Sequence, residues 1–116
     1  MDWQTIELKG YAYYSDLGYR ILVALVDNHF YDFVAEKDGT FIRVNVKTAG
    51  LKDKNQPNSW SISQASGSYT APRNSKGEVD VYLVWFPPKQ CFIEIDGDFF
   101  ADGNSKSKRI PKELLE

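Results

Sequence analysis

Three polar side chains near the middle of the chain are of types that could bind a small cation. Asp32 comes before the pair Asp38-Gly39, and Asn45 and Lys47 come after it. Carboxylate and amide oxygens are ligands of hard divalent cations, and a lysine ammonium beside them would place a positive charge next to the same point. This chemistry requires a local structure that brings the three side chains together.

A β-hairpin over residues 31–49 would do so. Asp-Gly flanked by alternating apolar residues strongly favours a two-residue turn. With Asp38 and Gly39 at the centre, Asp32 falls directly opposite Asn45, and Lys47 projects from the same face. Opposed Cβ atoms lie about 5 Å apart, so that both oxygens could reach one cation. The opposite face is then apolar and buried; it carries Tyr31, Phe33, Ala35, Ile42, Val44 and Val46. A solvated hairpin face without a ligand is the alternative.

The remaining elements follow from apolar spacing and from turn residues. Apolar residues recur at near-helical spacing from Trp3 to Leu17, at Ile6, Gly10 and Tyr13, and Gly18 supplies a stop, which predicts an amphipathic helix. Strands are expected at 19–25, 59–63, 79–86 and 90–95, the last two joined by Pro-Pro-Lys, with loops at 50–58 and 64–77 and a short helix at 110–116. A helix, a run of strands and a short helix predict an α/β (α+β) fold around a mixed sheet.

Composition narrows the class of protein. At 116 residues, we expect a single domain that spans residues 1–116 and needs no disulfide. The lone Cys91 lies in an apolar run and is expected to be a buried thiol. The chain has neither a signal-peptide pattern nor a long apolar stretch, which predicts a cytoplasmic protein. A net charge of −2 gives no overall basic character, so any contact with nucleic acid must come from local clusters.

The order of these residues resembles the PD-(D/E)xK nuclease superfamily, in which an acid is followed, across a hairpin, by an acid or amide, one residue and a lysine. Here the acid stands in "YD" and the lysine in "VNVKTA". The likeness is closest to the branch with group I intron-encoded homing endonucleases, whose motif looks like "QVKTA" after an "EKDG"-type turn. That branch has a glutamate on its first helix, which corresponds to Glu7 in "TIELKGYAYYSDLGY". The run "VDVYLVWF" resembles the final strands of the family, so the likeness covers most of the chain.

The resemblance implies a restriction-endonuclease-like fold and the activity of a Mg²⁺-dependent DNA endonuclease, with a homing endonuclease as the expected type. Mn²⁺ is expected to replace Mg²⁺ in the site. The implied catalytic residues are Glu7, Asp32, Asn45 and Lys47, and the implied metal ligands are Asp32, Asn45, the carbonyl of Val46, and Glu7. Most members have Glu or Asp where this chain has Asn45, and the similar branch has Gln. Because an amide carries no charge, the site is expected to hold its metal less tightly.

Basic residues near the motif in sequence are expected to contact the DNA phosphates: Lys52, Lys54, Arg73 and Lys76. A homodimer or a larger homo-oligomer is also expected, because cutting both strands of a duplex requires two sites. Two alternatives remain open. One is a Holliday-junction resolvase on the same fold, and the other is a non-catalytic DNA-binding or interaction module, suggested by Asn45 and the acidic net charge.

Overall fold

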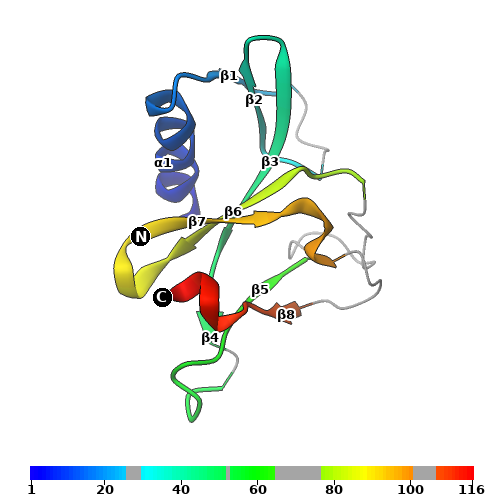
Figure 1. Cartoon of the computed structure of the whole chain (residues 1–116). Coiled ribbons are helices and arrows are strands. Elements are labelled where there is room, and N and C mark those ends of the chain that lie inside the picture. Colours follow the sequence, from blue (N-terminus) through cyan, green and yellow to red (C-terminus); the bar gives the residue numbers. More distant parts are fainter. Residues whose placement is uncertain (26–29, 52, 65–76, 101–106) are drawn as a thin grey trace.

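The computed structural model describes residues 1–25, 30–51, 53–64, 77–100 and 107–116, which form two β-sheets and one α-helix (Figure 1). The larger sheet has the strand order β1-β2-β3-β6-β7, and the smaller has the order β4-β5-β8. Strands β3 and β6 run parallel, whereas the other paired strands are antiparallel, so the expected mixed sheet is confirmed. The bounds are α1 Trp3–Asp16, β1 Arg20–Leu22, β2 Phe33–Lys37, β3 Thr40–Thr48, β4 Gly50–Leu51, β5 Trp60–Ser63, β6 Val81–Phe86, β7 Cys91–Asp96 and β8 Ser107–Arg109, with 3₁₀ turns η1 Pro87–Lys89, η2 Gly97–Phe100 and η3 Lys112–Leu115.

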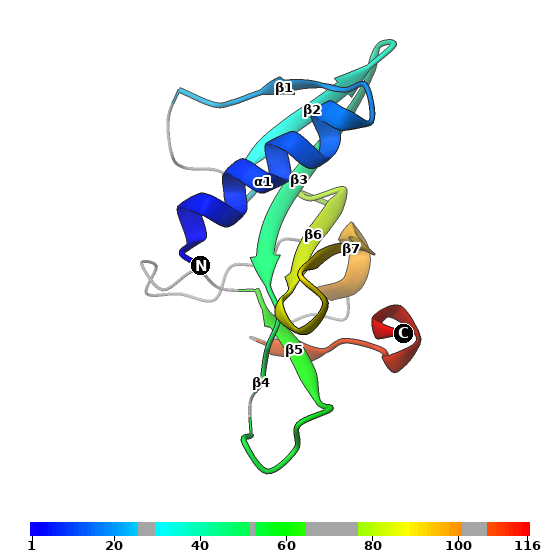
Figure 2. The same ribbon diagram turned by 90° about the vertical axis from the view of Figure 1, so that its left-hand side faces the viewer.

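Helix α1 lies across one face of the larger sheet (Figure 2). The side chain of Asp2 caps its start by accepting the N–H of Thr5 at 2.8 Å, and Gly18, with φ of +91°, follows its end as expected. The residues that it buries are Ile6, Gly10 and Tyr14. Trp3 is 70% exposed and Leu17 49%, so the expectation that both belong to the buried stripe is wrong: they lie at the ends of the helix, where they make little contact with the sheet.

Gly10 allows the helix to approach the sheet closely. A Cβ at this position would lie 3.2 Å from Cγ2 of Val46 and 3.4 Å from Cδ2 of Leu83, both on central strands. Contacts this short are tighter than ordinary van der Waals packing. The missing side chain therefore sets the distance between α1 and β3, and with it the position of the polar residues that face the sheet from the helix.

The hairpin between β2 and β3 has the expected turn and register. Asp38 and Gly39 both have positive φ, at 52° and 83°, as a two-residue hairpin turn requires. The ladder runs from the pair Lys37–Thr40 to the pair Phe33–Val44. The expected burial of Phe33, Ala35 and Val44 is confirmed, because all three pack with Tyr14 of the helix.

A second apolar cluster packs on the other face of the larger sheet. Alternation along β6 sends Leu83 toward the helix and Tyr82 and Val84 toward the smaller sheet. The smaller sheet contributes to this cluster through Ile62 of its central strand, β5, and through Ile110, which follows β8. Strand β3 leads into β4 through the buried Ala49, so one continuous segment serves both sheets.

Other local predictions need correction. Cys91 is exposed, because it begins the edge strand β7. The expected strand at 19–25 shortens to Arg20–Leu22, and Val23 and Leu25 are exposed beyond it. The short strands β4 and β8 were not expected, and the last helical segment is a 3₁₀ turn. No helix in the described ranges has the length and apolar character needed to cross a membrane.

Candidate active site

Asp32 lies in a bend just before β2, and its side chain bonds to the backbone of β3. Its N–H donates to the carbonyl of Val44 at 2.8 Å, and its carboxylate Oδ2 accepts the N–H of Val46 at 2.6 Å. The expected direct opposition of Asp32 and Asn45 is therefore wrong, since the ladder stops at Phe33. The carboxylate accepts the N–H that the residue before Asp32 would have used if the ladder continued, and the chain before β2 separates from β3 at this point.

Asn45 has an amide with one satisfied end and one unsatisfied end. Its Nδ2 donates to the carbonyl of Phe30 at 2.5 Å, and this contact fixes which end of the amide is which, because a carbonyl only accepts. Its Oδ1 is buried and has no hydrogen-bond partner among the residues that the structure describes. A buried acceptor without a donor costs about 1–3 kcal/mol, so this oxygen is suited to a ligand from outside the chain.

Lys47 follows on the same face of β3, as the alternation of side chains predicts. It is partly buried, and its Nζ lies 3.4 Å from the carbonyl of Gln64 at the end of β5. Burial lowers the pKa of the Lys47 ammonium, and the nearby negative charge of Asp32 partly opposes this effect. Asp32 and Lys47 are therefore close enough to interact electrostatically in the fold.

Glu7 reaches the same region from α1 through Tyr11. The Tyr11 hydroxyl donates to Oε1 of Glu7 at 2.9 Å. Burial raises the pKa of Tyr11 to about 12, with smaller contributions from the hydrogen bond to Glu7 and from the charges of Glu7 and Asp32. Tyr11 was not predicted from the sequence, although its position four residues after Glu7 puts both on one side of a helix.

The oxygens of these residues are of the kind that binds a hard divalent cation. In an extended strand, the N–H and C=O of one residue point to the same side, so the carbonyl of Val46 is directed to the edge at which its N–H meets Asp32. Together with the unsatisfied Oδ1 of Asn45 and the carboxylate of Glu7, this gives an all-oxygen donor set. Within the described part of the chain, no group of three or more His, Cys, Asp or Glu side chains could hold a metal, so a site here depends on the amide and the carbonyl.

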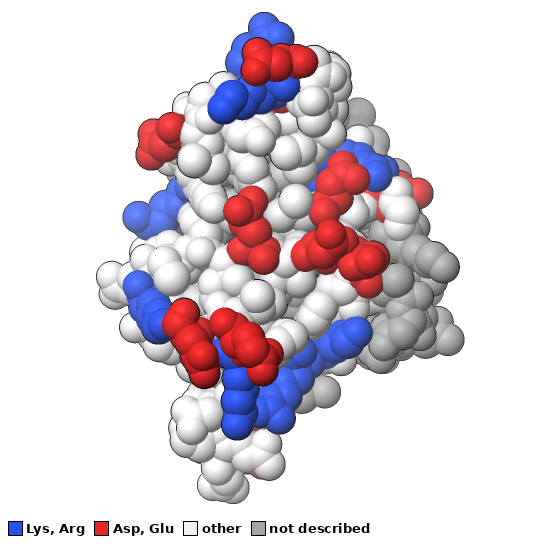
Figure 3. Space-filling view, in the orientation of Figure 1, with Lys and Arg blue, Asp and Glu red and all other residues white. Residues whose placement is uncertain are grey.

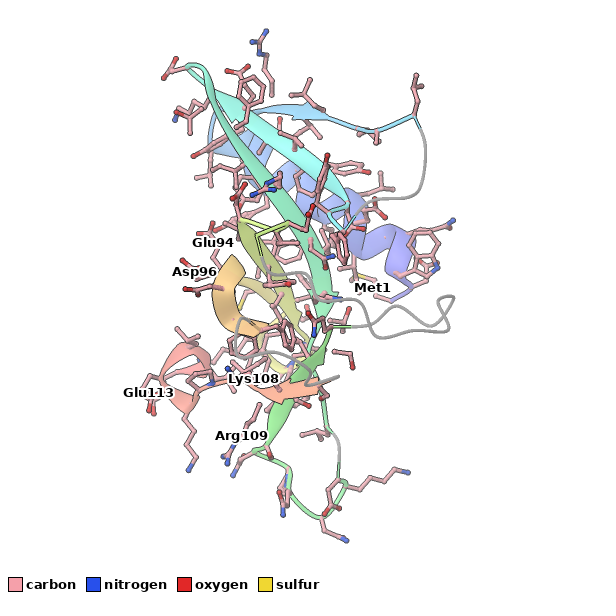
Figure 4. The ribbon with its side chains drawn as sticks, turned by 90° about the vertical axis from the view of Figure 1, so that its right-hand side faces the viewer. Met1, Glu94, Asp96, Lys108, Arg109 and Glu113 are labelled. Atoms are coloured by element: carbon pink, nitrogen blue, oxygen red, sulfur yellow. The ribbon has the colours of Figure 1, made fainter. Side chains whose placement is uncertain are left out.

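Charge is unevenly distributed over the surface. Figure 3 shows acidic side chains across the middle of one face and basic side chains below them. In Figure 4, Glu94 and Asp96 lie on β7, and Lys108 and Arg109 lie lower, on β8. Of the four basic residues expected to contact DNA, Lys54 is exposed between β4 and β5. The other three, Lys52, Arg73 and Lys76, lie outside the described residues.

Comparison with known proteins identifies the fold and the family of the chain. The structure of a bacterial homing endonuclease, I-Ssp6803I, superimposes with a TM-score of 0.69 at 17% sequence identity, and the match covers 92% of this chain and 70% of that one. No curated protein matches the chain by sequence. The family model for the PD-(D/E)XK endonuclease matches residues 5–110, which include all of α1 except its first two residues, both sheets and every polar residue of the proposed site. The chain therefore belongs to the PD-(D/E)XK endonuclease family.

Proposed function

We propose that this protein is a Mg²⁺-dependent DNA endonuclease whose active site is formed by Glu7, Asp32, Asn45 and Lys47. The observation that carries the proposal is the buried, unsatisfied Oδ1 of Asn45, two residues from Lys47 and next in sequence to Val46, whose N–H binds Asp32. A purely structural amide in this position would be expected to satisfy both of its ends.

The metal would be held by Asp32, by Oδ1 of Asn45, by the carbonyl of Val46 and by Glu7. When bound, Mg²⁺ supplies positive charge to the phosphate and lowers the pKa of a coordinated water. Because two carboxylates are present where most relatives of this motif have three acids, we expect weak affinity for the metal in the absence of DNA. The scissile phosphate then completes the charge balance of the site.

Lys47 would act on the attacking water and on the phosphate. Hydrolysis breaks one P–O ester bond, leaves a phosphate monoester and a hydroxyl, and requires the water to lose a proton. Burial lowers the pKa of Lys47, so its amine gives up its proton more readily than that of a solvated lysine. Its charged form would stabilise the negative charge that develops on the phosphoryl oxygens. Both roles need an amine at this place on β3.

The class of DNA substrate is the second part of the proposal. The structural neighbour is a homing endonuclease, which favours a defined duplex sequence as the target. A homodimer, or a larger homo-oligomer, would place two sites on the two strands of such a duplex. Sedimentation of the protein with and without its DNA measures the oligomeric state. If the protein is a monomer in both conditions, only nicking of one strand remains as its expected activity. A Holliday-junction resolvase would instead cleave four-way junctions of any sequence.

The test is a cleavage assay on supercoiled plasmid, linear duplex and a four-way junction, each with Mg²⁺, with Mn²⁺ and with EDTA. Asp32→Asn keeps an oxygen that accepts the N–H of Val46 but removes the charge, and it should slow cleavage by about 100-fold or more. Asp16→Ala, at the exposed end of α1, removes a carboxylate far along the helix and should cleave like the parent. If the parent leaves all three substrates intact with both metals, the chain is a binding module instead. If Asp32→Asn cleaves at the parent rate, the active site proposed here is wrong.

A further inference from the structure

We propose that Tyr11 is a positioning residue that holds the carboxylate of Glu7 in place for the reaction; this inference rests on the endonuclease function proposed above. Its hydroxyl donates to Oε1 of Glu7, and its ring packs beside the segment that carries Asp32. Tyr11 thus links Glu7 of the helix to the segment of the hairpin that carries Asp32.

The position of the Tyr11 ring is determined by the core. It meets the ring of Phe33 edge to face, with centroids 5.0 Å apart and planes at 87°. Phe33 is 1% exposed and directly follows Asp32 in the chain. A movement of the Tyr11 ring would therefore disturb the residue next to the proposed metal ligand, and the phenol oxygen is a fixed point on the border of the site.

The side chain of Glu7, in contrast, is flexible and needs a contact that orders it. A glutamate has three rotatable side-chain bonds and loses much rotational freedom when it is ordered. The hydrogen bond from Tyr11 engages Oε1 at 2.9 Å and orients the carboxylate as a whole. Small errors of position at a reacting group are costly for the rate, so a residue that orders Glu7 should act on the catalytic step more than on DNA binding.

A second tyrosine of the same helix donates to a carboxylate on β7 and serves as a control. The Tyr13 hydroxyl donates to Oε2 of Glu94 at 3.1 Å, in an exposed contact with β7. Glu94 has no place in the proposed site. Tyr11 and Tyr13 therefore make chemically similar phenol–carboxylate contacts from one helix, and only the first includes a residue of the site.

The experiment compares Tyr11→Phe with Tyr13→Phe; both substitutions keep the ring and remove the hydroxyl. Tyr11→Phe should lower kcat by about tenfold or more, leave KM for DNA within about twofold, and weaken Mn²⁺ binding measured by calorimetry. Its melting temperature should stay within about 2 °C of the parent, since the ring contact with Phe33 remains. Tyr13→Phe should match the parent in kcat and in affinity for Mn²⁺.

A double-mutant cycle with Glu7→Ala identifies the route of the effect. If Tyr11 acts through Glu7, Tyr11→Phe should cause no further loss of kcat once Glu7 is absent. If the parent cleaves DNA and Tyr11→Phe has the same kcat and the same affinity for Mn²⁺, this inference alone is overturned. The same holds if the losses of kcat caused by Tyr11→Phe and Glu7→Ala simply add in the double variant. A parent that cleaves no DNA overturns the proposed function, and this inference with it.

Discussion

Replacing Asn45 by aspartate should make the stability of the protein depend on metal. In the parent, Nδ2 of Asn45 donates to the carbonyl of Phe30, whereas an ionised aspartate has no donor for that carbonyl. The substitution removes one hydrogen bond and sets a carboxylate against a carbonyl oxygen. Without metal, we expect Asn45→Asp to lower the free energy of unfolding by about 1–3 kcal/mol. At about 4 °C per kcal/mol for a chain of this length, the melting temperature falls by about 4–12 °C.

Mg²⁺ should reverse part of this loss. The variant adds a negative charge to the oxygens that would hold the cation, and each tenfold decrease in Kd is worth about 1.4 kcal/mol. A ligand that binds only the folded state raises the free energy of unfolding by RT ln(1 + [L]/Kd). If the charge lowers Kd tenfold, the difference in melting temperature between parent and variant therefore narrows by about 6 °C at saturating metal.

The measurement is thermal unfolding of parent and variant, in EDTA and in about 10 mM Mg²⁺. Asn55→Asp is the matched control, because Asn55 is exposed in the loop before β5 and the substitution adds the same charge away from the site. The control should respond to Mg²⁺ like the parent. The reasoning is refuted if Asn45→Asp is as stable as the parent in EDTA, or if its deficit is the same with and without Mg²⁺.

Two further substitutions test the site and the fold. Lys47→Met should abolish cleavage yet raise stability at pH 7, because burial lowers the pKa of Lys47 in the folded state. The unfolded chain then binds the proton of Lys47 more tightly than the folded chain, so the free energy of unfolding of the parent should rise as the pH rises through the folded pKa toward 10.5, and the variant should lack this rise. Chemical unfolding of both proteins at pH 7 and pH 10 measures the difference. A Lys47→Met variant that still cleaves DNA would contradict the role of the amine. Gly97→Ala would place a Cβ 1.8 Å from the carbonyl oxygen of Val79 and disturb the 2.9 Å hydrogen bond from Gly97 to the carbonyl of Asp80. It should cost about 3 kcal/mol or more in chemical unfolding, and a loss under about 1 kcal/mol would show that the backbone yields easily there.

The hairpin was predictable because its information is local. Asp38 and Gly39 have the positive φ values that the turn requires, and side-chain alternation then determines the buried face from Phe33 to Val44. The position of Asp32 was not predictable in this way. Its carboxylate accepts the N–H of Val46, this hydrogen bond replaces the ladder, and the alternation of side chains contains no sign of that competition.

Contacts between distant segments account for the other differences. Strands β4 and β8 have two and three residues, too few for a periodic pattern, and each exists because β5 pairs with it. Cys91 lies in an apolar run, but its exposure depends on the position of β7 at the edge of the larger sheet. Tyr11 could be placed beside Glu7 from helical spacing, whereas its contact with Phe33 required the packing of α1 on the sheet.

The passage of β3 into β4 has a mechanical consequence. Asn45, Val46 and Lys47, three consecutive residues assigned to the proposed site, are followed at once by Thr48 and Ala49. The N–H of Ala49 donates to the carbonyl of Trp85 at 2.9 Å. No loop lies between them and the smaller sheet that could absorb a displacement. The Nζ of Lys47 also contacts the carbonyl of Gln64, which follows β5, so the side chain is connected to the smaller sheet as well. The position of the Lys47 amine therefore depends on the smaller sheet as well as on the larger one.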